Sequence, residues 1–396
     1  MAYYIIPRTY LNYNNIEYSE TEPDTKPQNV LLQSLSSHLY MNKEKITTNE
    51  TQWDVYKKYT NPFEYIHTTI PLKKRPVSKY KPLSRSYFKM VEMIHTFQIY
   101  FKHPIRTFHL AEGPGGFIEA ILNHRQCPED TYVGMTLLSD KRNSSVPGWN
   151  KSEIFLRDHP NVYIEEGIDK TGNILSVEGF EYVVSKYSNR MDFITADGGF
   201  DFSIDFNNQE IYIGKLLFAQ VAYAVCMQKY RGKFILKIFD CFMQHTVDIL
   251  YILSSFYENV YIIKPNTSRF ANSERYVVCT GFIYKTTRGF YPHFLRCFKD
   301  MMRTDATYPL RFLNVPISKL FIKKIEDCIS ILGKKQLQNI QYTLSFMENK
   351  PKQDKLEQLL RENVDKCIDW CVRYNVPSYH INTNINIFLH RDDYNL

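Results

Sequence analysis

The sequence predicts an α/β protein with a largely parallel sheet and helices on both faces, and three observations support this. Short β-rich runs alternate with helical ones between residues 106 and 264, which is typical of a parallel sheet. The turn after the first strand is dense in glycine. The 396-residue chain is long enough for a large buried core. We therefore expect ligands at the carboxyl ends of the strands.

The strands are expected where β-branched and aromatic residues gather, at 106–111, 132–137, 162–166, 191–196, 233–239 and 260–264. Helices are expected between them, notably from residue 117, over 210–230 and over 242–256. A last strand follows Glu274. Polar residues that come directly after strands, such as Asp197, are candidates for a site.

The turn Ala111-Glu112-Gly113-Pro114-Gly115-Gly116-Phe117, here called the glycine turn, joins the first strand to a helix. Glycine lets the backbone pass close to a ligand because it has no Cβ. A dinucleotide site needs a different glycine spacing and an acidic residue after the second strand, and a P-loop needs Gly-Lys-Ser/Thr. A Rossmann-like sheet that holds a smaller adenosyl ligand remains.

Five strings resemble one family. They are Ala-Glu-Gly-Pro-Gly-Gly-Phe at 111–117, Gly-Met-Thr-Leu at 134–137, Ala-Asp-Gly-Gly-Phe at 196–200, Lys-Pro-Asn-Thr-Ser-Arg at 264–269 and Asn-Ser-Glu-Arg-Tyr-Val-Val-Cys at 272–279. The family is that of the FtsJ-like (RrmJ-type) S-adenosylmethionine-dependent RNA 2′-O-methyltransferases. Within it the chain most resembles the eukaryotic and large-virus enzymes that methylate the first transcribed nucleotide of capped mRNA. The resemblance is strong from about residue 84 to residue 282, and it does not cover the first 70 or so residues.

The resemblance implies a catalytic tetrad of Lys89, Asp197, Lys237 and Glu274. A ribose 2′-hydroxyl must lose its proton as it attacks the sulfonium methyl, yet an ordinary lysine, with a pKa of about 10.4, is protonated at neutral pH. Burial and a neighbouring cation lower a lysine pKa, and carboxylates hold ammonium groups in place. We expect Lys237 to be the general base, oriented by the other three residues, and we expect no metal in this step.

Each tetrad position also has a structural interpretation: Lys237 as a snorkelling edge residue, Asp197 as a turn-former, Glu274 as a cap and Lys89 as one more surface cation. Two other functions stay open. One is the same chemistry on ribosomal or transfer RNA, and the other is a catalytically silent methyltransferase-fold subunit that binds RNA. An intact tetrad disfavours the silent subunit, and the string at 272–279 favours the cap enzymes.

The cofactor implied by the resemblance is S-adenosyl-L-methionine. The residues expected to contact it are Gly113, Pro114, Gly115, Gly116, Phe117, Asp169 and Asp197. Asp169 resembles the acid that accepts a hydrogen bond from the adenine amino group. Asp-x-Thr-Gly is equally good Asx-turn chemistry, so both interpretations of Asp169 stay open.

Charge favours an RNA partner. Lysine and arginine number 49 against 42 aspartate and glutamate, a net charge of +7. The expected RNA-binding cations are Lys73, Lys74, Arg75, Lys79, Lys81, Arg85 and Arg269. The basic run from Lys73 extends to Lys89, and Tyr80 and Tyr87 are interleaved with its cations, so phosphate contact and base stacking are both available. A solvated face is the alternative for this basic run. The expected partner is the capped 5′ end of mRNA, with other capping enzymes or RNA polymerase as further partners and no membrane.

Three consecutive parts are expected: an N-terminal extension over 1–80, a Rossmann-like methyltransferase core over 81–290 and a helical C-terminal extension over 291–396, with helices at 317–332, 335–348 and 353–374. No function is predicted for residues 1–80. Eight cysteines without a Cys-x-x-Cys pair indicate reduced thiols rather than a metal site. We find no signal peptide and no run of 18 apolar residues, and we expect a soluble intracellular protein, in the nucleus or in a cytoplasmic viral factory or virion.

Overall fold

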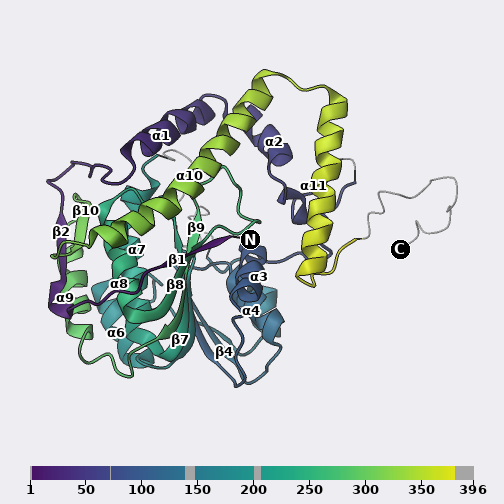
Figure 1. Cartoon of the computed structure of the whole chain (residues 1–396). Helices are drawn as coiled ribbons and strands as arrows, with labels where there is room; N and C mark the ends of the chain where they lie inside the picture. Colours follow the sequence, from purple (N-terminus) through teal and green to yellow (C-terminus); the bar gives the residue numbers. More distant parts are fainter. Residues whose placement is uncertain (1, 72, 139–147, 200–206, 380–396) are drawn as a thin grey trace. The chain divides into compact units, whose positions relative to one another are not determined.

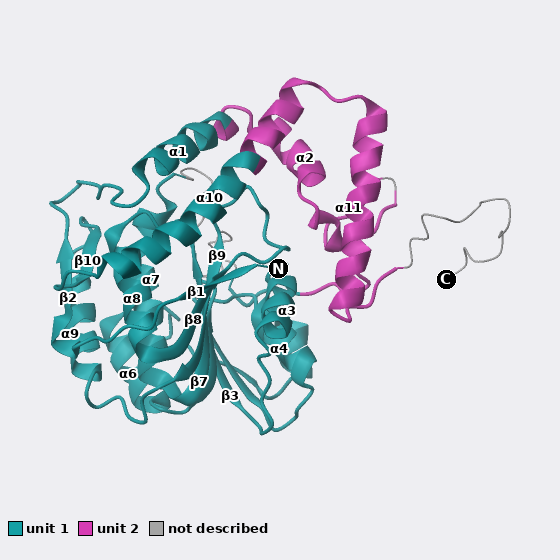
Figure 2. Cartoon of the chain, in the orientation of Figure 1, with its two compact units in different colours: residues 1–45, 83–338 teal, residues 46–82, 339–396 magenta. Residues whose placement is uncertain are grey.

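A computed structural model describes residues 2–71, 73–138, 148–199 and 207–379 (Figure 1). The chain divides into two compact units, each built from segments far apart in the sequence (Figure 2). Residues 1–45 and 83–338 form the larger unit, and residues 46–82 and 339–396 form the smaller one. The sequence predicted three consecutive parts. The observed division differs from that prediction, because the first 45 residues belong to the same unit as the glycine turn.

The larger unit is built around a sheet that has eight strands among the described residues, in the order β1-β8-β9-β7-β6-β3-β4-β5. Their bounds are β1 Tyr3–Ile6, β3 Arg106–Leu110, β4 Thr131–Met135, β5 Val162–Ile164, β6 Met191–Ala196, β7 Gln228–Ile238, β8 Tyr257–Ile263 and β9 Arg275–Phe282. The α/β prediction is confirmed, and each expected strand overlaps an observed one.

The neighbouring strands β5, β4, β3, β6 and β7 run parallel, so their carboxyl ends meet at one edge of the sheet. β9 is antiparallel to both β7 and β8, and β1 is antiparallel to β8. A parallel neighbour needs a long crossover connection. Only the loop 264–274, without a helix, joins β8 to β9. The chain therefore turns back, and this loop lies at the edge where the parallel strands end.

Helices cover both faces of the sheet, with α3 and α4 on one side and α6, α7 and α8 on the other (Figure 1). The helices of this part are α3 Ser86–Thr96, α4 Gly116–Arg125, α5 Glu153–Asp158, α6 Val177–Tyr187, α7 Gln209–Met227, α8 Gln244–Phe256 and α9 Tyr291–Met301. Among the described residues, α7 is the one helix long and apolar enough to cross a membrane by length and composition, and 89% of its apolar window is buried inside the protein.

The first 45 residues contribute directly to the larger unit. β1 extends the main sheet by pairing with β8, Tyr3 opposite Ile263. β2 (Ile16–Glu20) pairs with β10 (Pro309–Leu313) in a separate two-stranded sheet. Helix α1 spans Gln33–Thr47. Residues for which the sequence predicted no function therefore complete the sheet.

Helix α10 runs without interruption over Lys319–Glu348, so the prediction of two helices divided near Gly333 was wrong. A Cβ at Gly333 would lie 2.9 Å from the Leu35 side chain of α1. Glycine at this position thus lets the Leu35 side chain pack closely against α10, and it does not end the helix. Helix α11, Gln353–Arg373, agrees with the third predicted helix.

The smaller unit packs α2 (Glu50–Thr60) and the short helix η2 (Glu64–Ile66) with α11. Asn363 Nδ2 donates a hydrogen bond to the Tyr59 carbonyl at 2.7 Å. The Lys79 N–H donates to the Pro377 carbonyl at 2.8 Å, and the Tyr379 N–H donates to the Val77 carbonyl at 2.9 Å. Two segments almost 300 residues apart in sequence are thus tied together within this unit.

Candidate active site

A cavity of about 520 Å³ opens at the carboxyl ends of the parallel strands, within the volume range usual for small-ligand sites. Residues that follow β3, β4, β5 and β6 line it together with the end of β7, the start of α3 and Leu216 in the middle of α7. They are Ser84, Arg85, Ser86, Lys89, Ala111, Glu112, Gly113, Pro114, Thr136, Leu137, Gly172, Asn173, Ile174, Leu175, Asp197, Gly199, Leu216 and Lys237. The cavity therefore lies where the parallel sheet predicted a ligand.

The glycine turn needs its glycines for three different reasons. Gly115 has a φ of +102°, a left-handed conformation that other residues rarely adopt. A Cβ at Gly116 would lie 2.2 Å from Ser84 Oγ and 2.4 Å from Ser86 Oγ. A Cβ at Gly113 would lie 2.5 Å from a backbone carbonyl oxygen. A larger residue would strain the backbone at Gly115, would move backbone at Gly113 and would displace the two serine side chains at Gly116.

Of the residues expected at the cofactor, Gly113 and Pro114 line the cavity, while Gly115, Gly116 and Phe117 are not among its lining residues. These last three residues support the turn without lining the cavity. Phe117 is fully buried, and its N–H donates a 2.6 Å hydrogen bond to Glu112 Oε1.

Glu112 is a cavity residue to which the sequence analysis gave no role. Its carboxyl group accepts backbone hydrogen bonds at the start of α4, where helix N–H groups favour an acidic side chain. Burial raises the pKa of Glu112 well above its usual value, although these backbone donors act in the opposite direction. The sequence feature that could have pointed to Glu112 is its position, as an acidic residue, inside the glycine turn.

Lys89 and Glu274, which are 185 residues apart in sequence, form a buried ion pair. Lys89 Nζ donates a 2.8 Å hydrogen bond to Oε2 of Glu274 and lies 2.7 Å from Oε1. Burial lowers the pKa of Lys89 more than Glu274 and Asp197 raise it. Burial alone would raise the pKa of Glu274, but Lys89 and Lys237 hold it well below its usual range. The site thus keeps a carboxylate between two ammonium groups.

Asp197 and Lys237 form the second pair of the tetrad. Lys237 Nζ donates to the Asp197 backbone carbonyl at 2.6 Å and lies 3.3 Å from Asp197 Oδ1. The same Oδ1 accepts a 2.9 Å hydrogen bond from the hydroxyl of Tyr276, which lies opposite Lys237 on β9. Lys89 Nζ lies 5.9 Å from the centroid of the Tyr276 ring. Tyr276 therefore contacts both pairs, and the sequence analysis missed it although its string was recognised.

Lys264 holds the loop that carries Glu274. Its Nζ donates hydrogen bonds of 2.8 Å to the backbone carbonyls of Asn272 and Glu274. Burial lowers its pKa to about 7, although the neighbouring Glu274 carboxylate raises it. At the start of the same loop, Glu92 of α3 accepts a 2.7 Å hydrogen bond from the Thr267 N–H. One sequence feature could have singled out Lys264 as a site residue, namely its position directly after β8.

Asp169 accepts a 3.1 Å hydrogen bond from the Thr171 N–H, which is the Asx turn of the alternative interpretation. It is not among the residues that line the cavity. Asn173, farther along the same loop, is among them, and Gly172 packs so closely that a Cβ there would lie 1.9 Å from the Thr136 carbonyl oxygen. A role for Asp169 at the adenine stays a prediction.

The expected RNA-binding cations are divided between the two units. In the smaller unit the exposed ones are Lys73, Lys74, Arg75, Lys79 and Lys81. There the guanidinium of Arg75 lies 4.3 Å from the centroid of the Tyr379 ring. In the larger unit Arg85 lines the cavity and donates to the Thr267 carbonyl at 3.3 Å, and Arg269 follows in the loop 264–274.

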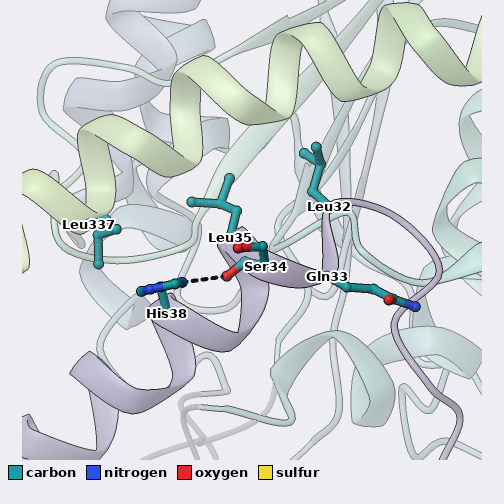
Figure 3. A pocket seen from close by; sticks show the side chains of 6 residues that line it. All are labelled: Leu32, Gln33, Ser34, Leu35, His38 and Leu337. Atoms are coloured by element: carbon teal, nitrogen blue, oxygen red, sulfur yellow. Dashed lines mark hydrogen bonds between the residues drawn. The ribbon is translucent and has the colours of Figure 1, made fainter.

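A second cavity, of about 570 Å³, lies between the start of α1 and α10 (Figure 3). Leu32, Leu35 and Leu337 give it a mostly apolar lining. His38, whose Nδ1 lies 2.7 Å from the Ser34 carbonyl oxygen, is the one ionisable residue among the six that line it. The first cavity is lined by several charged side chains, so this second cavity is the weaker candidate for catalysis. Within the described residues, no cluster of three or more potential metal ligands occurs.

The sequence profile of FtsJ-like methyltransferases matches residues 82–282. Cap-specific mRNA (nucleoside-2'-O-)-methyltransferase 1 of Trypanosoma brucei brucei is 31% identical over 195 residues, which are 48% of this chain and 52% of that protein. Cap-specific mRNA (nucleoside-2'-O-)-methyltransferase 2 of Drosophila melanogaster is 28% identical over 262 residues, 63% of this chain and 37% of that protein. Cap-specific mRNA (nucleoside-2'-O-)-methyltransferase 1 of Homo sapiens is 32% identical over 220 residues, which are 50% of this chain and 26% of that protein.

This chain therefore spans about half or less of the length of these three relatives. Among solved structures, human methyltransferase-like protein 13 in complex with SAH aligns with 56% of this chain and 90% of that one, at 10% identity and a TM-score of 0.30. A similarity at that level adds nothing to the argument.

Proposed function

This chain belongs to the FtsJ-like methyltransferase family, and we propose that it transfers a methyl group from S-adenosyl-L-methionine to the ribose 2′-hydroxyl of the first transcribed nucleotide of capped mRNA. The product would be cap 1, made from cap 0. One observation carries the proposal: the ion pairs Lys89–Glu274 and Lys237–Asp197 stand beside a cavity at the carboxyl ends of the strands. The choice of capped mRNA as the substrate rests on the names of the relatives.

The residues of the cavity fit S-adenosyl-L-methionine. Gly113 and Pro114 bring backbone to its wall, and Asp197 offers a carboxylate to a ligand that carries an ammonium and a sulfonium group. Asn173 has an amide able both to donate to and to accept from an adenine edge. When bound, this cofactor supplies a methyl group on a sulfur that leaves as a neutral thioether.

Lys237 is the proposed proton acceptor for the ribose 2′-hydroxyl. Both lysines line the cavity, but Lys89 lies within 2.8 Å of both carboxylate oxygens of Glu274, whereas Lys237 lies 3.3 Å from Oδ1 of Asp197. Lys237 is therefore the tetrad lysine less committed to a carboxylate. Its proton acceptance adds general-base catalysis to the larger effect of holding the two reactants in line.

RNA binding is assigned to cations of both units. Arg85 and Arg269 lie at the cavity and in the adjoining loop, and the exposed cations between residues 73 and 81 add phosphate contacts. The proposed partner is the capped 5′ end of mRNA, with other capping enzymes or RNA polymerase as further partners. Such a substrate places the activity inside a cell or virion, in the nucleus or in a cytoplasmic viral factory.

The test is transfer of labelled methyl from S-adenosyl-L-methionine to capped and uncapped short RNA, followed by nuclease mapping of the methylated ribose. The expected result is label on the first transcribed nucleotide of capped RNA, lost in Lys237→Ala and Lys237→Arg because a guanidinium stays protonated. Lys229→Ala is the control, since Lys229 lies at the other end of β7 and is paired with Asp192. Equal transfer to capped and uncapped RNA would favour the second function, methylation of ribosomal or transfer RNA, and cofactor binding without transfer would favour the silent subunit.

A further inference from the structure

Two tetrad residues are each followed in the chain by a buried residue of opposite charge. Asp240 comes three residues after Lys237, and Arg275 comes directly after Glu274. The side chains of Asp240 and Arg275 are 3% and 1% exposed, and Arg275 Nη2 lies 3.6 Å from Asp240 Oδ1. This separation is beyond a hydrogen bond. Arg275 instead donates to the Phe239 carbonyl at 3.3 Å.

The closest partner of Asp240 comes from the N-terminal part of the chain. Lys43 of α1 donates a 2.9 Å hydrogen bond to Asp240 Oδ2, and its side chain is 6% exposed. Asp240 lies in the connection between β7 and α8. The segment before α1 is bound to the same connection, because the N–H groups of Val30 and Leu31 donate to the Phe242 carbonyl at 2.8 and 3.1 Å. All of α1 precedes the family match at 82–282.

Gln336 of α10 reaches the same cluster from the C-terminal side of the family match. Its Oε1 accepts from Arg275 Nη2 at 3.5 Å, and its Nε2 donates to the Ala271 carbonyl at 3.2 Å. Gln336 therefore joins Arg275 to the loop 264–274, whose last residue is Glu274. Segments on both sides of the matched region thus meet next to two tetrad residues.

We infer that Lys43 is a positioning residue of the active site: by holding Asp240, it leaves Arg275 bonded to Phe239 and Gln336 and so keeps Glu274 against Lys89. Among the described residues, Asp240 Oδ1 has no hydrogen-bond partner. Without Lys43, the buried Asp240 carboxylate would lose its hydrogen-bonded cation and keep only the looser ion pair with Arg275 at 3.6 Å, and a buried charge with so little compensation is costly. Arg275 would then move toward Asp240, and Glu274, its neighbour in the chain, would move with it.

The kinetic test rests on the proposed function and uses single-turnover methyl transfer to capped RNA at saturating substrate. Lys43→Met is expected to slow the step at least tenfold, about 1.4 kcal/mol, while the dissociation constants of cofactor and RNA stay within twofold. Lys43→Arg should recover most of the rate because it keeps the cation. Lys45→Met, on the exposed side of the same helix, is the matched control and should leave the rate unchanged. All rates are measured at a temperature well below the thermal unfolding midpoint of each variant.

A double variant separates positioning from a general loss of α1 packing. In Lys43→Met combined with Asp240→Asn, no charge remains to draw Arg275 away from Phe239 and Gln336, so the rate should return to within about threefold of wild type. Arg275 loses its carboxylate neighbour in this variant but keeps its hydrogen bonds to the Phe239 carbonyl and to Gln336, and circular dichroism checks that the variant is folded. If the double variant is as slow as Lys43→Met, or if Lys43→Met is as fast as wild type, the inference is wrong.

Crystal structures of the wild type and Lys43→Met give a readout that needs no activity. The expected change is an Asp240–Arg275 contact that shortens to hydrogen-bond distance, together with a longer distance between Lys89 Nζ and the Glu274 carboxylate. An unchanged Lys89–Glu274 contact overturns the inference. Absence of methyl transfer by the wild type would instead overturn the proposed function, and this structural comparison would still test Lys43.

Discussion

Replacing Glu274 by glutamine tests how strongly the buried pair with Lys89 stabilises the fold. The side chains of Lys89 and Glu274 are 7% and 12% exposed, so the ammonium group would lose its carboxylate partner in a site with little water. Removing one member of a buried pair costs about 3–5 kcal/mol. Asp197 still attracts the ammonium group, which favours the lower part of that range.

Protonation sets a ceiling on this cost, because Lys89 can fold in its neutral form. With an unfolded pKa of about 10.4, neutralising the lysine at pH 7 costs about 1.36 × 3.4, or about 4.6 kcal/mol, and at pH 9 about 1.36 × 1.4, or about 1.9 kcal/mol. Burial already lowers the folded pKa of Lys89, and loss of Glu274 lowers it further. Between the new folded pKa and about 10.4 the unfolded chain binds more protons, so the variant gains stability as pH rises.

The assay is the free energy of unfolding in urea for the wild type and Glu274→Gln at pH 7 and pH 9. We expect a loss of about 3–4 kcal/mol at pH 7 that shrinks to no more than about 2 kcal/mol at pH 9. Glu181→Gln is the control, since the Lys299–Glu181 pair is 50% and 41% exposed and should be worth less than about 1 kcal/mol. A loss at pH 7 below about 1 kcal/mol, or the same loss at both pH values, would refute the reasoning.

Three further predictions concern cofactor and RNA. Gly113→Ala should weaken S-adenosyl-L-methionine binding at least about tenfold by calorimetry, because its Cβ would lie 2.5 Å from a backbone carbonyl oxygen; Gly289→Ala, whose Cβ would meet nothing closer than 3.6 Å, should not. Asn173→Ala should weaken the same binding by about 1 kcal/mol and Asp169→Ala by less, and the reverse order would restore the adenine role of the aspartate. Neutralising three exposed cations within residues 73–81 should lower the log–log salt slope of RNA binding by roughly one unit for each phosphate that the protein no longer neutralises, whereas an unchanged slope would mean a solvated face.

The elements of the sheet could be predicted because their patterns are local. Parallel strands align their carboxyl ends, so the glycine turn after β3 and Asp197 after β6 had to approach each other once the alternation of strands and helices was recognised. The pairing of Lys89 with Glu274 had no local signal and was reached through the family resemblance alone. The geometry brings these two side chains together, but it does not by itself assign their roles.

The residues that were missed act through contacts that leave no periodic pattern. Lys43 is one lysine among several polar residues of α1, and only the folded chain shows that it is buried against Asp240. The predicted gap between the helices 317–332 and 335–348 contains Gly333, and a glycine that permits close packing looks in sequence like one that ends a helix. Tertiary contact decides such positions.

The strand order also sets when the sheet can be completed during synthesis. β8 and β1 are joined to the rest of the sheet only through β9 among the described strands, and β9 ends at Phe282. The chain is made from its N-terminus, so Tyr3–Ile6 must wait more than 250 residues for its partner β8 and longer for β9. Pairings so distant in sequence form slowly. Until Phe282 has emerged, β1 and β8 can form at most a two-stranded ribbon with open edges, and such edges are where nascent chains associate wrongly.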